Sequence, residues 1–161
     1  MKPLIIYSSY TGTTHQIAVQ VHEACGGEII EVKSWDLMSR FFMFFSRYSP
    51  EMQVRNDGIP PGTIDLSGYD PIVIGTSVWM GKPTSAIRKT IAALTGCSGK
   101  RVIIFATCGE DPGTTLATLS QEIAAKGMTV AGQFSLDAAG IADGTVQKDL
   151  IGRIRELGSN P

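Results

Sequence analysis

Short apolar runs alternate with amphipathic segments along most of this chain. Four runs are bounded by Gly, Ser, Thr or Pro, and they cover residues 4–7, 71–75, 101–107 and 128–134. A fifth run, at residues 28–33, alternates apolar with charged residues. The runs at 71–75 and 101–107 are almost continuously apolar, which is typical of strands buried on both faces of a parallel sheet. The alternating run at 28–33 is typical of an edge strand.

Helical periodicity fills the gaps between these runs. Apolar residues recur at helical spacing in four segments, and a glycine follows each of them; the segments are 13–24, 84–94, 114–125 and 146–157. Five strand-and-helix alternations in 161 residues predict one domain, residues 1–161, of the α/β class. We expect a three-layer, doubly wound, five-stranded parallel sheet with helices on both faces.

The stretch from 34 to 69 interrupts this rhythm. It holds four phenylalanines around one methionine, at Phe41, Phe42, Met43, Phe44 and Phe45. On one helix they would cover most of its circumference, which is more than a single buried stripe needs. Two interpretations stay open: a helix packed on the sheet, or a contact surface for a second copy of the chain, a quinone or the edge of a membrane.

Composition excludes several function classes. Fourteen basic and fifteen acidic residues give a net charge of −1, so no basic excess indicates nucleic acid. The three cysteines stand far apart and form no metal-ligand spacing, so no metal site is expected. The opening apolar run is too short for a signal peptide, and no run is long enough for a transmembrane segment, so a cytoplasmic location is expected.

The segment between the first expected strand and helix carries candidate chemistry. Its hydroxyl-bearing residues and one glycine are Ser9, Tyr10, Thr11, Gly12, Thr13 and Thr14. Backbone N–H groups at the start of a helix lack intrahelical partners, and the helix dipole favours an anion there. Because the loop contains no Lys or Arg, a mononucleotide phosphate fits it better than a triphosphate. The competing interpretation is an ordinary capped turn.

A family resemblance supports the phosphate interpretation. The flavodoxin signature consists of two apolar residues, an aromatic residue, the motif T/S-x-T-G-x-T, then an Ala and an apolar residue. The chain matches it position by position, at Ile5, Ile6, Tyr7, Ser9, Thr11, Gly12, Thr14, Ala18 and Val21. The chain therefore resembles the flavodoxin family over nearly its whole length. The resemblance implies strand order 2-1-3-4-5 and an FMN cofactor, whose phosphate would lie on the loop at 9–14.

The resemblance implies that two later loops hold the flavin ring. After the third strand, the implied cofactor-binding residues are Thr76, Ser77, Val78, Trp79, Met80 and Gly81. Trp79 would stack on the ring, although it also fits an ordinary core position. After the fourth strand, the backbone of Thr107, Cys108 and Gly109 would meet the pyrimidine edge. No catalytic side chain is expected, since the flavin carries the redox chemistry.

Two residues depart from the family pattern. Met80 stands where many flavodoxins have a glycine that adopts positive φ, a conformation that costs a methionine free energy. Lys82 stands where they usually have acidic residues, and a cation there would favour reduced, anionic flavin. The segment 75–86 is also similar in part to menaquinone-dependent protoporphyrinogen oxidases, which lack the tryptophan and carry a basic insertion.

These features predict an FMN-binding electron-transfer protein, which would exchange electrons with a redox partner protein or a quinone-like small molecule. The alternative is a flavin-dependent oxidoreductase acting on a quinone or a protoporphyrinogen. A third class, a non-flavin receiver-like domain on the same sheet, fits poorly because the acidic residues it needs are replaced by Ser8, Ser9, Gly75 and Thr76.

Overall fold

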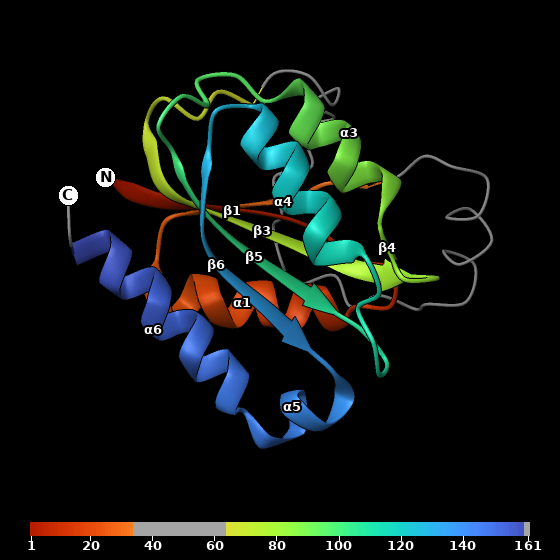
Figure 1. The fold of residues 1–161 in the computed structure, drawn as a ribbon. Helices are drawn as coiled ribbons and strands as arrows, with labels where there is room; N and C mark the ends of the chain where they lie inside the picture. The colour runs from red at the N-terminus through yellow and green to blue at the C-terminus, as the bar shows by residue number, and fades with distance from the viewer. Residues whose placement is uncertain (34–63, 160–161) are drawn as a thin grey trace.

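The computed structural model describes residues 1–33 and 64–159, and its central feature is one twisted sheet (Figure 1). The strands are β1 (Lys2–Ser8), β2 (Glu28–Glu31), β3 (Tyr69–Trp79), β4 (Lys82–Pro83), β5 (Arg101–Thr107) and β6 (Thr129–Leu136). The helices are α1 (Thr13–Cys25), α3 (Ser85–Ala93), α4 (Thr115–Ala125), α5 (Ala138–Asp143) and α6 (Thr145–Ser159). The aromatic segment at Phe41 to Phe45 lies outside the described residues.

The sheet confirms the expected topology. Its strands run in the order β2-β1-β3-β5-β6, and all four of these pairings are parallel. With the short β4 set aside, this is the order 2-1-3-4-5. The alternating segment at 28–33 forms β2 at the edge of the sheet, as its half-polar pattern predicts.

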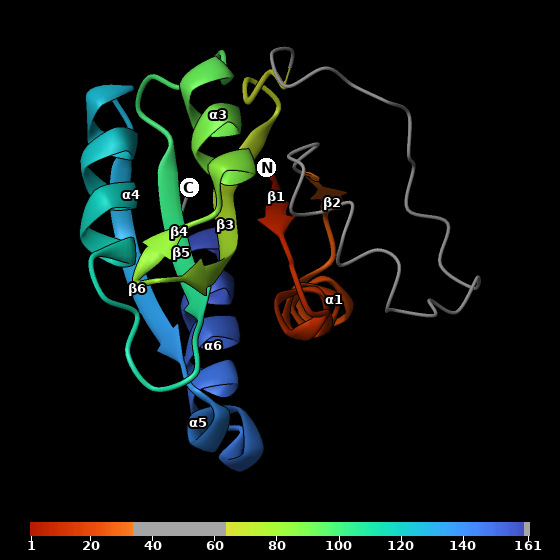
Figure 2. The ribbon, with the colours of Figure 1, turned by 90° about the vertical axis from the view of Figure 1, so that its right-hand side faces the viewer.

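Helices cover both faces of the sheet, which confirms the three-layer architecture (Figure 2). The side chains of each strand alternate between the faces, because successive residues in a strand point in opposite directions. On one face, Leu4, Ile6 and their counterparts on β3 and β5 pack against α3 and α4. On the other face, Ile5, Tyr7 and their counterparts pack against α1 and α6. The two cores are therefore separated by the sheet.

Three local features differ from the sequence-based expectation. β3 continues beyond Gly75 to Trp79, so the residues 76–79 that we expected in a loop lie in a strand. Its last two residues pair with β4 in an antiparallel hairpin that apolar periodicity did not reveal, because β4 has only two residues. The six-residue helix α5 precedes α6, and the side chain of Asp137 caps it by accepting a hydrogen bond from the Gly140 N–H.

Gly75 in the middle of β3 is required by packing. A Cβ built on Gly75 would lie 2.2 Å from the ring of Phe105, which is fully buried in the neighbouring strand β5. The phenylalanine ring therefore occupies the space that any other side chain at position 75 would need. Replacement by a larger residue would separate β3 from β5 just before both strands reach the site.

Candidate functional site

The loops that follow β1, β3 and β5 meet at the carboxyl edge of the sheet, where ligands bind in doubly wound folds. The first loop leads directly into α1. Gly12 precedes this helix with φ +94°, a left-handed conformation that favours glycine, and no side chain caps the helix. A Cβ built on Gly12 would meet nothing within 4 Å, so the space beside the helix start is open.

The N-terminus of α1 offers backbone donors into this space. The Ser9 Oγ accepts the Gly12 N–H at 3.0 Å, and the Gly12 carbonyl accepts the Gln16 N–H at 3.0 Å, which orders the turn. Thr13 and Thr14 occupy the first two helical positions, whose N–H groups lack intrahelical partners. The hydroxyls of Thr11 and Thr13 lie 3.5 Å apart at the rim of the loop. This arrangement is suited to an oxyanion.

A buried network of three hydroxyls joins the three loops. The Thr14 Oγ1 lies 2.8 Å from the Ser77 Oγ and 2.6 Å from the Thr107 Oγ1. The Ser77 Oγ also accepts the N–H of Tyr10 at 3.2 Å. Thr14, Ser77 and Thr107 are 0%, 8% and 6% exposed, so solvent barely reaches the network. The network fixes the start of α1 against the ends of β3 and β5.

One hydroxyl proton of this network is not used by the hydrogen bonds within it. Three hydroxyls carry three protons, and the two bonds between them use two. Thr14 is fully buried and is best satisfied when it donates within the network. The remaining O–H, on Ser77 or Thr107, then has no acceptor among the described residues. A bound ligand with oxygen acceptors would supply one.

Thr14 was expected to place its hydroxyl on a phosphate, whereas the structure has this hydroxyl between Ser77 and Thr107. The reason is its position in the helix: the second residue of α1 points inward, toward the ends of β3 and β5. Thr14 can therefore serve an anion through its backbone N–H, while its side chain positions the loops. Ser9, Thr11 and Thr13 remain partly exposed in the first loop.

Trp79 lies at the surface beside the first loop. Its side chain is 50% exposed, which excludes the ordinary core position that was the alternative for it. The ring of Tyr10 contacts it edge-on, with centroids 6.1 Å apart and an angle of 70° between the planes. An exposed aromatic face thus stands next to the helix start that is suited to an anion.

The turn after Trp79 holds two residues in the left-handed region. Trp79 pairs with Lys82 across the hairpin, and Met80 and Gly81 between them have φ values of +50° and +71°. We expected Met80 to resist a positive φ, but the structure has it there. A type I′ turn, one of the two favoured two-residue hairpin turns, has positive φ at both turn positions, and its twist matches that of the strands. The tight β3–β4 pairing therefore overrides the preference of methionine.

Val78 and Thr76 play different parts in this segment. Val78 pairs with Pro83 and is partly buried, so it stiffens the hairpin. Thr76 is fully buried, and its Oγ1 accepts the Thr84 N–H at 3.1 Å while donating to the Ser77 carbonyl. Its side chain thus supports the connection to α3.

The loop after β5 begins with an extension of the sheet. The Cys108 N–H donates to the Leu136 carbonyl at 3.0 Å, which leaves this N–H unavailable to a ligand. The Cys108 thiol lies 3.6 Å from the Ser135 hydroxyl, on the side of β6. Gly109 follows and is exposed. Of the three residues expected at the pyrimidine edge, Thr107 joins the hydroxyl network and Gly109 keeps its backbone accessible.

The same loop contains two residues that our sequence interpretation missed. The N–H and hydroxyl of Thr114 both donate to the Gly81 carbonyl, at 2.9 and 3.2 Å. Gly113 packs directly against Gly81. The Pro-Gly-Thr-Thr motif at 112–115 was the available signal, since it indicates a turn before a helix, but it gave no information about the partner of the turn.

A buried Tyr–His pair lies under the first loop. The Tyr7 hydroxyl is 2.5 Å from the His15 Nδ1, and both residues are at least nine-tenths buried. The charged residues that follow the site strands are exposed: Lys82 on the hairpin and Glu110 and Asp111 after β5. The described part of the site is therefore lined mainly by hydroxyls, backbone and aromatic rings.

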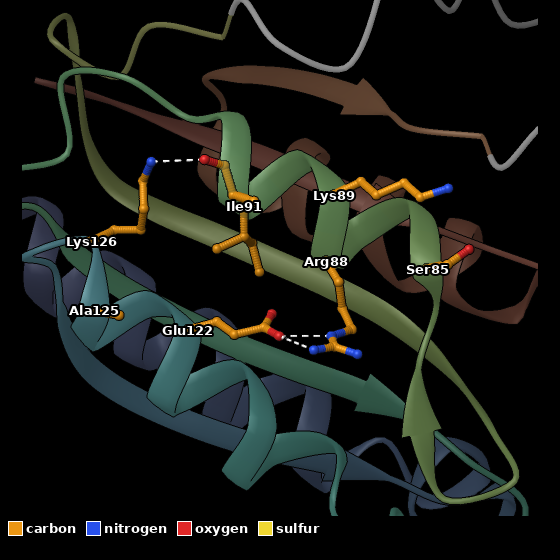
Figure 3. Close-up of a pocket in the computed structure, with 8 residues that line it drawn as sticks. Ser85, Arg88, Lys89, Ile91, Glu122, Ala125 and Lys126 are labelled. Carbon is orange, nitrogen blue, oxygen red and sulfur yellow. Dashed lines mark hydrogen bonds and ion pairs between the residues drawn. The ribbon is translucent and has the colours of Figure 1, made fainter.

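A separate hollow lies between α3 and α4, away from the predicted site residues (Figure 3). Arg88 forms an ion pair with Glu122 across it, with 2.7 Å between Nε and Oε1, and the Lys126 ammonium donates to the Ala92 carbonyl. Within residues 1–33 and 64–159, no group of three or more His, Cys, Asp or Glu side chains is arranged to hold a metal ion. None of the helices in these ranges is long and apolar enough to span a bilayer.

Comparison with known proteins places the fold. No protein-family model and no curated protein matches the chain. Among solved structures, a flavoprotein from Lactobacillus acidophilus in complex with FMN is 22% identical with a TM-score of 0.56, covering 88% of this chain and 97% of its own. The two-electron reduced flavodoxin of Megasphaera elsdenii is 16% identical with a TM-score of 0.64, covering 96% and 98%.

A third similar structure belongs to an enzyme. It is an NADH:FMN oxidoreductase in its apo form, 16% identical with a TM-score of 0.66, covering 98% of this chain and 88% of its own. These similarities extend over nearly the full length of both proteins in each pair, and they agree with the strand order described above. The chain has the flavodoxin-like fold.

Proposed function

We propose that this chain binds FMN at the carboxyl edge of the sheet and transfers electrons through it. The observation that carries the proposal is the juxtaposition of two features with different chemistry. The uncapped start of α1, with open space beside Gly12, suits a terminal phosphate. The half-exposed Trp79, 6.1 Å from Tyr10 of the same loop, suits a flat ring. FMN carries both groups.

The donor set supports a mononucleotide over a nucleotide held by a metal ion. The first loop offers hydroxyls and N–H groups but no ammonium or guanidinium. The unused hydroxyl proton of the Ser77–Thr14–Thr107 network adds a donor on the inner side of the loop. When bound, FMN would supply the redox chemistry. The described residues would bind its phosphate, face its ring and limit the access of water.

A titration tests this proposal. We expect one equivalent of FMN to bind without added metal, and riboflavin to bind less tightly because it lacks the phosphate. Equal affinities for FMN and riboflavin would contradict the phosphate assignment. Replacement of Trp79 by leucine should weaken FMN and riboflavin by the same factor, because it removes the ring contact and leaves the α1 start intact.

A matched pair of substitutions separates charge from folding. Gly12→Asp and Gly12→Asn have nearly the same shape, and both residues tolerate the left-handed conformation and favour the position before a helix. They differ by one negative charge, which would repel a phosphate. We expect Gly12→Asp to bind FMN at least tenfold more weakly than Gly12→Asn, while the two bind riboflavin equally. Equal FMN affinities would exclude an anion at this helix start.

A second candidate function is an FMN-dependent oxidoreductase acting on a quinone-like substrate. It is favoured by Lys82, an exposed cation directly opposite Trp79 in the hairpin, because a cation near the ring stabilises reduced flavin. Steady-state quinone reduction by the FMN complex with NADH as donor would support the enzyme. A complex that accepts electrons once and does not turn over would support the carrier.

A further inference from the structure

The tip of the β3–β4 hairpin is held by the loop that precedes α4. The carbonyl of Gly81 accepts two hydrogen bonds from one residue, at 2.9 Å from the Thr114 N–H and 3.2 Å from the Thr114 hydroxyl. A carbonyl oxygen has two lone pairs, so both of its acceptor sites are used. The orientation of the Gly81 carbonyl is thereby fixed from outside the hairpin.

Backbone packing reinforces this contact. Gly113 has φ +57°, and a Cβ built on it would lie 2.5 Å from the Gly81 Cα and 2.7 Å from the Gly81 oxygen. Contacts under 3 Å with backbone atoms require one chain to move. The two glycines therefore lie in direct contact only because neither carries a side chain.

The Thr114 hydroxyl does not cap α4, although its position before the helix predicts a cap. Thr114 immediately precedes α4, where a threonine side chain ordinarily accepts a hydrogen bond from the helix. Here it makes no such bond, and its hydroxyl donates to Gly81 instead. The hydroxyl therefore contributes to the position of the hairpin and little to the stability of α4.

The clamped hairpin carries the residues proposed to face the cofactor ring. Met80, at φ +50°, and Trp79 are 88% and 50% exposed, so few contacts of their own hold them in place. A turn strained in this way stays in place only when its surroundings determine it. The described contacts that do so are the pairing with β4, the edge-on contact of Trp79 with Tyr10, and the hydrogen bonds and packing from Gly113 and Thr114.

We infer that Thr114 is a positioning residue for the cofactor ring, which acts through the Gly81 carbonyl to hold Trp79 in its binding orientation. The inference rests on the proposed function in naming FMN as the ligand. The clamp itself is a property of the protein without ligand. It joins the loop after β3 to the loop after β5, so that the two sides of the ring site form one unit.

The test compares three single substitutions. Thr114→Val removes the hydroxyl with little change of shape, and Thr114→Ser restores it. Thr118→Val is the matched control, one turn further along in α4, because the Thr118 hydroxyl has no hydrogen-bond partner among the described residues. All three are made in a Trp35→Phe background, which leaves Trp79 as the only tryptophan of the two in the sequence. Trp79 fluorescence then reports on the hairpin alone.

We expect Thr114→Val to lower the fluorescence anisotropy of Trp79 in the protein without FMN, and to weaken FMN about three- to tenfold. The reduction potential of bound FMN should shift as well, whereas the thermal midpoint should fall by no more than about 2–4 °C, the cost of one hydrogen bond. Thr114→Ser and Thr118→Val should retain the parent values. Unchanged anisotropy in Thr114→Val, or equal effects of Thr114→Val and Thr118→Val, would overturn the inference.

The two proposals fail separately. If the unsubstituted protein binds no FMN, the proposed function is wrong, and the anisotropy of Trp79 alone then decides whether Thr114 holds the hairpin. If FMN binds and Thr114→Val changes neither the anisotropy nor the affinity, the proposed function stands and the positioning role is wrong.

Discussion

Substitution of Thr14 by valine tests the central structural claim, that a buried hydroxyl holds the three site loops together. Valine has nearly the shape of threonine, so the substitution removes hydrogen bonds and leaves packing almost unchanged. It removes two bonds, of 2.8 Å to Ser77 and 2.6 Å to Thr107, at a residue that is fully buried.

The expected cost follows from what each partner retains. The Ser77 hydroxyl still accepts a hydrogen bond from the Tyr10 N–H, whereas the Thr107 hydroxyl loses the one side-chain partner described for it. A net contribution of about 1 kcal/mol for each of the two bonds, with about 1–3 kcal/mol for a buried hydroxyl left unpaired, gives a total of about 3–5 kcal/mol. This is a large share of the roughly 5–15 kcal/mol that stabilises a typical domain.

Urea unfolding followed by far-UV circular dichroism measures this loss. For a slope of about 2 kcal/mol/M, the midpoint should fall by about 1.5–2.5 M. Thr14→Ser keeps the hydroxyl and loses one buried methyl, so it should cost only about 1 kcal/mol. Thr13→Val is the second control, because the Thr13 hydroxyl lies in the exposed part of the loop. Equal losses for Thr14→Val and either control would refute the network as a stabilising element.

Two further predictions concern the hairpin beside Trp79. Met80→Gly should raise the free energy of unfolding, measured in a thermal melt, by roughly 0.5–1 kcal/mol. A left-handed methionine costs about 1–2 kcal/mol, and the entropy of glycine in the unfolded chain offsets about 0.4–1 kcal/mol of the gain. A loss of stability would show that this turn is not strained. Lys82→Asp exchanges an exposed cation for an anion. In a spectroelectrochemical titration, it should make the reduction potential of bound FMN for the second electron roughly 20–80 mV more negative. An unchanged potential would place Lys82 too far from the ring to act.

The pattern of apolar residues was sufficient to predict the layers and most elements of this fold. The continuous apolar runs became β3 and β5 in the middle of the sheet, and the alternating run became the edge strand β2. The reason is that burial on two faces, one face or none imposes different periodicities, and these are visible without a structure. The strand order came from the family resemblance, and the structure confirmed it.

The composition of the first loop also indicated its chemistry. In the structure, Gly12 has a positive φ, and the start of α1 is uncapped. Trp79 was identified from its place after the third strand, and its exposure excludes a core position. These features are local, because they depend on residues that are adjacent in the chain.

Only the tertiary structure decided which hydroxyls and loops act together. Thr14 and Thr107 are separated by 93 positions in the sequence, and Gly81 and Thr114 by 33, yet both pairs are in hydrogen-bond contact. The inward direction of Thr14, the left-handed Met80 and the diversion of Thr114 from its helix each result from a neighbour on another element. Sequence periodicity determines which face of an element is buried, whereas the partners it meets there depend on how the strands are ordered in space.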